Sequence, residues 1–326
     1  MAADPSAPDL AALLTRSVAA RAGEGADQRF GVAVSGGPDS MALLDLAIRA
    51  FPGRVEAATV DHGLRAASAD EAAMVADWCA VHAIPHAILH PAVPPSGNVQ
   101  HWARAQRYAA LAAWREERRI DWIFTAHHAD DQLETMLMRL NRGAGVNGLA
   151  GIRARQGHVL RPLLGVRRAQ LLAYAEHRRL PHVEDPSNSD PRFDRAAIRA
   201  RLREAGWLDA QAATRSAAAL AEAEEALDWT VEALAARHVR AEGAGLLLDR
   251  TDLPRELLRR LLLRMLARID GDAPAPRGDA LDRVIAAAGA GGQGTLGDML
   301  VKGGPVWRVL PAPPRRKGSL RKGSTG

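Results

Sequence analysis

The sequence predicts an α/β protein, with a doubly wound and mostly parallel sheet followed by a smaller, mainly helical domain. Strand-like and helix-like segments alternate through the first half, a glycine-rich turn follows the first strand, and the second half repeats apolar residues at helical spacing. Such alternation implies crossover connections, which cover both faces of a parallel sheet with helices.

Each expected element of the first half is a short apolar run or a longer segment with helical periodicity. Strands are expected at 30–34, 55–60, 86–90 and 121–126, and helices at 41–49, 68–82, 99–118 and 130–142. Ligands of such sheets bind beyond the carboxyl ends of the strands. The residues that follow each strand are therefore the candidates for a functional site.

The second half predicts helices at 211–240 and 253–268, then two short strands within 294–310. We expect four parts in the chain: a helical lead-in at 1–28, a sheet-containing domain at 29–205, a mainly helical domain at 206–310 and a tail at 311–326. The tail is rich in Pro, Gly, Ser and basic residues, a composition typical of disorder.

The composition is that of an ordinary globular protein of 326 residues, 47% hydrophobic and 25% charged. No apolar run reaches the roughly 18 residues that span a bilayer. The first residues lack the pattern of a signal peptide, so we expect a cytoplasmic protein that has no membrane contact. The one cysteine, Cys79, fits that compartment. A net charge of +5 favours a polyanionic partner, although whole-chain charge is a weak indicator.

The first strand ends at residues 35–40, which read Ser-Gly-Gly-Pro-Asp-Ser and lead into a helix. Such a turn directs backbone N–H groups and the positive end of the helix dipole at one point, where a phosphate can bind. Asp39 can hold the metal ion that accompanies a nucleoside triphosphate. The ending of a Walker A loop is missing. Without its flanking strand and helix, the string is equally well a common turn.

The second strand is followed by Asp61 and His62, and the fourth by His127, Asp131 and Glu134. Asp61 and Arg65 of the same string could grip a nucleotide or an amino group, but alone the string is more often an ordinary turn. Asp131 and Glu134 lie three residues apart at a helix start, so both carboxylates can share a magnesium ion with phosphate oxygens. His127 can contact the phosphates or transfer a proton. The helix dipole alone explains Asp131 about as well, and a zinc site lacks a third nitrogen or sulfur ligand.

The helix that carries these carboxylates is followed by a segment with Arg142, Gly143 and Gly145. A glycine just past a helix end is a normal cap. Several glycines close together instead favour a mobile loop that approaches a ligand.

These motifs resemble the PP-loop ATP pyrophosphatase superfamily, whose members cleave ATP between the α and β phosphates and adenylate a carbonyl oxygen. Their order narrows the resemblance to the tRNA(Ile)-lysidine synthetase family. It rests on the phosphate loop together with Val-Asp-His-Gly-Leu-Arg at 60–65, the His-His block at 127–135, Arg-Gly-Ala-Gly at 142–145, Arg-Pro-Leu-Leu at 161–164 and Asp-Pro-Ser-Asn at 185–188. The match covers about residues 29–205, which it identifies as a PP-loop ATP-binding catalytic domain.

The resemblance implies roles for individual residues. ATP would be bound by Ser35, Gly36, Gly37, Pro38, Asp39, Ser40, Asp61 and His62, and Mg²⁺ by Asp39, Asp131 and Glu134. The catalytic residues would be Asp39, Arg107, His127, Asp131, Glu134 and Arg199, and the loops near the substrate would contain Arg142, Gly143, Gly145, Asp185 and Asn188. Guanidinium groups suit phosphate oxygens, which gives the two arginines a physical basis.

The implied reaction adenylates the C2 oxygen of the wobble cytidine in the CAU anticodon of tRNA(Ile). The ε-amino group of free L-lysine then attacks C2 and gives lysidine, AMP and pyrophosphate. Residues 206–310 would help to bind the tRNA, and family members are often homodimers.

Two other functions remain as alternatives. Another PP-loop tRNA-modifying reaction, such as thiolation, is disfavoured because enzymes that carry sulfur on cysteines or on a cluster need several cysteines and this chain has one. A non-catalytic protein that binds ATP or RNA would keep its function when Asp131 is replaced by Asn.

Overall fold

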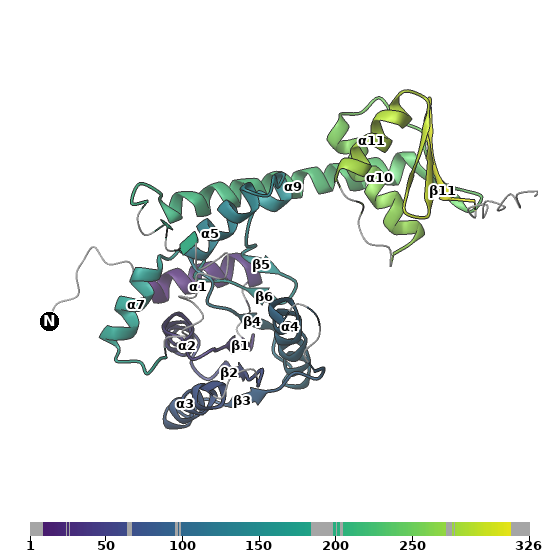
Figure 1. Cartoon of the computed structure of the whole chain (residues 1–326). Coiled ribbons are helices and arrows are strands. Elements are labelled where there is room, and N and C mark those ends of the chain that lie inside the picture. The colour runs from purple at the N-terminus through teal and green to yellow at the C-terminus, as the bar shows by residue number, and fades with distance from the viewer. Residues whose placement is uncertain are drawn as a thin grey trace, which may run out of the picture. The chain divides into compact units, whose positions relative to one another are not determined.

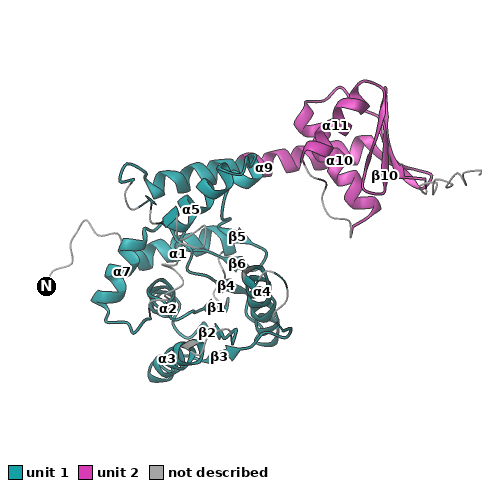
Figure 2. Cartoon of the chain, in the orientation of Figure 1, with its two compact units in different colours: residues 1–222 teal, residues 223–326 magenta. Residues whose placement is uncertain are grey.

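The computed structural model of the chain describes residues 9–23, 25, 27–63, 67–94, 97, 99–183, 198–199, 201–202, 205–271, 276 and 278–313. The chain divides into two compact units, residues 1–222 and 223–326 (Figure 2). Helix α9 (Ala210–His238) contributes residues to both units. Most of the expected tail lies outside the described residues.

The first unit contains a six-stranded sheet in the order β3-β2-β1-β4-β6-β5 (Figure 1). All neighbouring strands are parallel except β5 and β6, which pair antiparallel at one edge. The strands are β1 (Phe30–Ala33), β2 (Val55–Val60), β3 (His86–Leu89), β4 (Trp122–Phe124), β5 (Arg155–Gln156) and β6 (Val159–Leu160). The predicted doubly wound, mostly parallel sheet is confirmed.

Helices cover both faces of this sheet because successive residues of each strand point to opposite sides. Phe30 and Val32 of β1 face one core, formed with α2 (Pro38–Ala50) and α3 (Ala67–Val81). Ala33 belongs to the other core, with Trp114 of α4 (Val99–Glu117). Gly31 of β1 lies under the Trp114 ring, where a Cβ would come within 2.6 Å of the indole.

Two further helices, α1 (Leu10–Ala22) and α7 (Arg168–His177), join the core that contains α2. The buried Asp45 of α2 fixes α7, because its carboxylate accepts hydrogen bonds from the Tyr174 hydroxyl and from Nε of Arg178 at 3.1 Å. Burial, followed by the hydrogen bond to Asp45, raises the pKa of Tyr174, so the phenol stays protonated and donates.

The carboxyl end of β4 leads through Thr125–His128 into α5 (Ala129–Leu140), and α6 (Val146–Leu149) follows. Because β1, β2, β4 and β6 are parallel, their carboxyl ends meet at one edge of the sheet. That edge holds the residues that the sequence marks as candidates.

The second unit combines helices with an antiparallel sheet in the order β7-β8-β11-β10-β9. The elements after α9 are β7 (Val239–Glu242), β8 (Gly245–Leu248), α10 (Arg255–Ile269), α11 (Gly278–Gly289), β9 (Gln293–Leu296), β10 (Met299–Lys302) and β11 (Trp307–Pro311). Two strands were expected here and the sheet has five, because residues 293–311 form three strands instead of two and a β7–β8 hairpin is added. The additional β7–β8 hairpin is short, and its first strand, mostly exposed, has no clear hydrophobic alternation.

Candidate active site

The phosphate loop joins β1 to the start of α2. Gly36 has a φ of +81°, which favours glycine, and its carbonyl accepts a hydrogen bond from Val183 N–H at 3.0 Å. Ser40 Oγ accepts from Ser35 N–H at 3.2 Å and donates to the Gly37 carbonyl at 2.9 Å. Within the described part of the chain, the N–H groups of Gly36 and Gly37 have no hydrogen-bond partner. Together with the uncapped start of α2, these amides can bind an anion.

His128 joins the phosphate loop to the carboxylates of α5. Its Nε2 lies 3.6 Å from Asp39 Oδ2 and 3.5 Å from Asp131 Oδ2, and its Nδ1 lies 3.7 Å from Asp130 Oδ2. Burial lowers the pKa of His128, but the hydrogen bond that its imidazole donates to Asp39 and the charges of the three aspartates raise it more, so its pKa lies above the usual value. The buried imidazole therefore holds several acidic groups at one place.

Two aspartates of this cluster fit a magnesium ion. Asp39 Oδ1 is buried and has no hydrogen-bond partner in the described structure. Asp131 reaches the same His128 nitrogen from α5. Mg²⁺ is usually held by one or two carboxylates together with substrate phosphates, so the donor set suits it. Among the described residues, no group of three or more His, Cys, Asp or Glu forms an all-protein metal site.

The Glu134 carboxylate forms a hydrogen-bonded ion pair with an arginine. Nε of Arg199 donates to Glu134 Oε1 at 2.7 Å and Nη2 donates to Oε2 at 3.1 Å, and Nη2 lies 3.7 Å from Asp131 Oδ1. Burial lowers the pKa of Arg199, but Glu134, Asp131 and Asp39 raise it above the usual value, so the guanidinium stays charged. The structure thus places Glu134 and Arg199 together and leaves Asp39 and Asp131 as the better-placed pair for a metal.

His127 and Arg107 contact other groups. His127 Nδ1 lies 3.0 Å from Thr125 Oγ1, at the exit of β4. Arg107 lies on α4 near Tyr108 and His62, and burial lowers its pKa. No ion pair joins Arg107 to a carboxylate within the described residues.

Asp61 and His62 follow β2 as expected. The Asp61 carboxylate accepts hydrogen bonds from Gly63 N–H at 2.8 Å and Ser68 Oγ at 2.6 Å, and these bonds lower its pKa. The His62 ring lies beside the Trp102 ring, with 6.0 Å between centroids. Burial, followed by the charge of Arg107, lowers the pKa of His62, so the imidazole is neutral at pH 7.

The glycine-rich segment after α5 is folded back onto that helix. Arg139 Nη1 donates to the carbonyls of Gly148 at 2.7 Å and Gly151 at 3.0 Å. Gly143 has a φ of +68°. Arg142 lies beside it in the same turn, and Gly145 is the N-cap residue of α6. Asp185 and Asn188 lie outside the described residues.

Comparison with known proteins identifies the family. A PP-loop domain matches residues 11–205. A tRNA(Ile)-lysidine synthase of Zymomonas mobilis is 43% identical over 302 residues, which cover 90% of this chain and 91% of the relative. A tRNA(Ile)-lysidine synthase of Novosphingobium aromaticivorans is 44% identical and covers 88% of this chain and 90% of its own length. The chain belongs to the tRNA(Ile)-lysidine synthase family.

A solved structure supports the fold. A U34-tRNA thiolase from Methanococcus maripaludis aligns with a TM-score of 0.53 and 19% identity, covering 65% of this chain and 80% of the thiolase. As a lysidine synthase family member with a PP-loop domain, the chain is an ATP-dependent ligase. None of its described helices is long and apolar enough to cross a membrane.

Two residues of the candidate site were not expected from the sequence. His128 lies three residues before Asp131, a spacing that fits the capping box found in the structure, whereas the sequence motif pointed to His127. Arg168, the first residue of α7, lies with Nε 3.9 Å from Asp39 Oδ2. In the sequence, Arg168 is only a basic residue near the start of an expected helix, which is a weak signal of a functional role.

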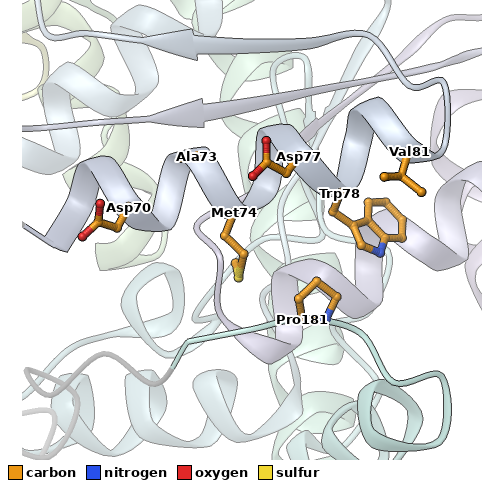
Figure 3. Close-up of a pocket in the computed structure, with 7 residues that line it drawn as sticks. All are labelled: Asp70, Ala73, Met74, Asp77, Trp78, Val81 and Pro181. Carbon is orange, nitrogen blue, oxygen red and sulfur yellow. The ribbon is translucent and has the colours of Figure 1, made fainter.

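A pocket of about 500 Å³ lies between α3 and Pro181. It is lined by Asp70, Ala73, Met74, Asp77, Trp78, Val81 and Pro181 (Figure 3). Met74 also approaches the phosphate loop, because a Cβ on Gly36 would lie 3.4 Å from its Cε. None of the carboxylates gathered around His128 lines this pocket.

Proposed function

We propose that the chain forms lysidine at the wobble position of an isoleucine tRNA with a CAU anticodon, using ATP and free L-lysine. The observation that carries this proposal is the meeting of the phosphate loop and the α5 carboxylates at His128, which contacts both Asp39 and Asp131. Family membership indicates the substrates, and this geometry provides a place where a triphosphate could bind and react.

In the first step, the C2 oxygen of the cytidine attacks the α phosphorus of ATP and pyrophosphate leaves. The amides of Gly36 and Gly37 would hold phosphate oxygens, since hydrogen-bond donors aimed at developing charge are the main contribution of a protein to such a transfer. Mg²⁺, held by Asp39 and Asp131, would supply further neutralisation of the phosphate charge when bound.

In the second step, the ε-amino group of lysine attacks C2 and AMP leaves. The ammonium must first lose a proton, so a base is needed close by. His127 and the carboxylates of α5 are the candidates, because they share the segment between the β4 exit and the first turns of α5. Arg199 would hold the Glu134 carboxylate in place during this step through two hydrogen bonds.

A cytoplasmic location and a homodimer complete the proposal. Both come from the sequence and the family rather than from a contact in this chain. Light scattering at several protein concentrations tests the dimer, and a single monomer mass throughout would reject it.

Incorporation of radiolabelled lysine into an unmodified tRNA(Ile) with a CAU anticodon tests the function. Label is expected only with ATP present, and AMP and pyrophosphate should form in equal amounts. ATP cleavage without label would indicate another acceptor. If neither occurs, the chain binds ATP or RNA without catalysis.

A further inference from the structure

The start of α7 brings the Arg168 side chain to the phosphate loop. Its Nε lies 3.9 Å from Asp39 Oδ2, and its side chain is 40% exposed, so a ligand bound at the loop can reach it. The two arginines expected from the sequence lie against other residues. Arg199 is held by Glu134 and Asp131, and Arg107 lies near Tyr108 and His62.

The backbone fixes where the Arg168 side chain begins. Its N–H donates to Asp130 Oδ2 at 2.7 Å, which ties the start of α7 to the first turn of α5. Asp39 and Arg168 are separated by 129 residues, the same separation as Asp45 and Tyr174, which are hydrogen-bonded one to two turns further along the same two helices. Helices α2 and α7 therefore run parallel, and both begin beside the phosphate loop.

Local charges leave Arg168 available for a phosphate. The neighbouring Arg167 is shared between Asp130 and Asp209, at 3.6 Å and 3.8 Å. Among the described residues, the Arg168 guanidinium instead has one long contact with a carboxylate, that of Asp39, which the proposed metal ion would also use. When Asp39 binds a cation, the attraction between Asp39 and Arg168 weakens. The guanidinium then lies next to the loop with donors for oxyanion oxygens.

We infer that Arg168 binds the β and γ phosphates of ATP and neutralises the pyrophosphate as it leaves, an inference that rests on the adenylation step proposed above. In that step, a bond forms between the cytidine O2 and the α phosphorus. The bond from the α phosphorus to the bridging oxygen breaks, and pyrophosphate leaves with the electron pair. Arg168 would stabilise the negative charge that develops on this leaving group.

Ligand binding to the full-length protein at fixed Mg²⁺ tests this assignment without turnover. The three probes are inorganic pyrophosphate, α,β-methylene ATP and AMP, each titrated by calorimetry. For Arg168→Ala we expect the dissociation constants of the first two to rise about 10- to 100-fold, the size of a lost charge-assisted hydrogen bond. AMP lacks the β and γ phosphates, so its constant should change by less than about twofold. For Arg168→Lys the dissociation constants should lie between those of the wild type and Arg168→Ala, because lysine keeps the positive charge but lacks the paired N–H donors of the guanidinium.

Arg215→Ala is the matched control, since Arg215 also has one arginine–carboxylate contact at 3.9 Å, to Asp209. It should bind all three probes as the wild type does. An equal loss for AMP, or unchanged pyrophosphate binding in Arg168→Ala, would overturn the inference. If Arg168→Ala does not fold, the ratio of pyrophosphate to AMP affinity in Arg168→Lys decides. A chain that binds pyrophosphate through Arg168 but makes no lysidine would reject the proposed acceptor and leave the phosphate subsite standing.

Discussion

Arg199 and Glu134 are joined by two hydrogen bonds, from Nε to Oε1 at 2.7 Å and from Nη2 to Oε2 at 3.1 Å, across 65 residues of sequence. The Glu134 carboxylate is buried, and Arg199 also approaches Asp131. The pair therefore fixes a second segment of the chain to the helix that carries the acidic residues.

Removal of Arg199 should destabilise the first unit. Arg199→Ala leaves the buried Glu134 charge without its partner, and such a loss costs about 3–5 kcal/mol. Urea unfolding measures it. The double variant Arg199→Ala, Glu134→Gln should regain part of the loss, because the amide carries no charge. Additive losses in the double variant would contradict this account.

Replacement of Asp131 tests the catalytic role of the cluster. Asp131→Asn keeps an oxygen that can accept the hydrogen bond from His128 N–H, so the fold should persist. Lysidine formation should fall by orders of magnitude and the Mg²⁺ concentration for half-activation should rise. Asp70→Asn, in the first turn of α3, is the control and should stay active. Unchanged turnover of Asp131→Asn would instead favour a binding protein.

Gly36→Ala should weaken ATP binding. The φ of +81° costs a residue with a Cβ about 1–2 kcal/mol, and the new methyl group would meet Val183 at 3.3 Å and Met74 at 3.4 Å. Gly157→Ala has a similar backbone penalty, at a φ of +56°, but open space around the Cβ. Calorimetry should therefore find weaker binding of α,β-methylene ATP only for Gly36→Ala. Equal binding by the two variants would show that the loop tolerates the change.

Cys79 should make stability depend on pH in alkaline solution. Burial raises the pKa of this thiol to about 11, whereas an unfolded thiol titrates near 8.5. Between these two values the thiol loses its proton only in the unfolded chain, which favours unfolding. The contribution of Cys79 to the free energy of unfolding is therefore complete below about pH 8 and falls by about 2–3 kcal/mol by pH 11. The difference in unfolding free energy between wild type and Cys79→Ala isolates this effect. A difference that stays constant from pH 8 to pH 11 would rule it out.

Arg260 should stabilise the second unit. It donates to the buried Glu224 at 2.9 and 2.7 Å, and also to Asp228 and Glu256. Arg260→Ala should lower the unfolding free energy of residues 223–326 by about 3 kcal/mol, because Glu224 loses its partner. Arg264→Ala removes a pair with the exposed Glu232 and should cost under about 1 kcal/mol. Amide hydrogen exchange in α10 distinguishes the two variants. Equal protection of these amides in Arg260→Ala and Arg264→Ala would contradict the expected difference.

Much of the first unit could be predicted from local patterns. The strand at 55–60 coincides with β2, and the other expected strands and helices of that half were found with ends shifted by up to three residues. The helix expected from residue 41 begins at Pro38, where proline suits the first turn. Strands β5 and β6 were missed because two residues each are too short for any periodicity.

The parts of the candidate site that directly follow strand ends could be predicted from the sequence. The parts that depend on contacts between residues far apart in the sequence could not. The loop at 35–40 and the pair Asp131 and Glu134 are local motifs. The position of Arg168 beside Asp39 depends on the packing of α7 against α2, which no local pattern encodes. The roles assigned to these residues stay predictions until the variants are measured.

The hydrogen bond between Asp45 and Tyr174 also sets an order of events during synthesis. Helix α2 leaves the ribosome 129 residues before the tyrosine that completes its packing, a delay of roughly 6–25 seconds at the usual rates of translation. During that time the apolar residues of α2, which include Leu43 and Leu44, lack part of their native cover. The nascent chain therefore offers a hydrophobic segment to chaperones until α7 has emerged.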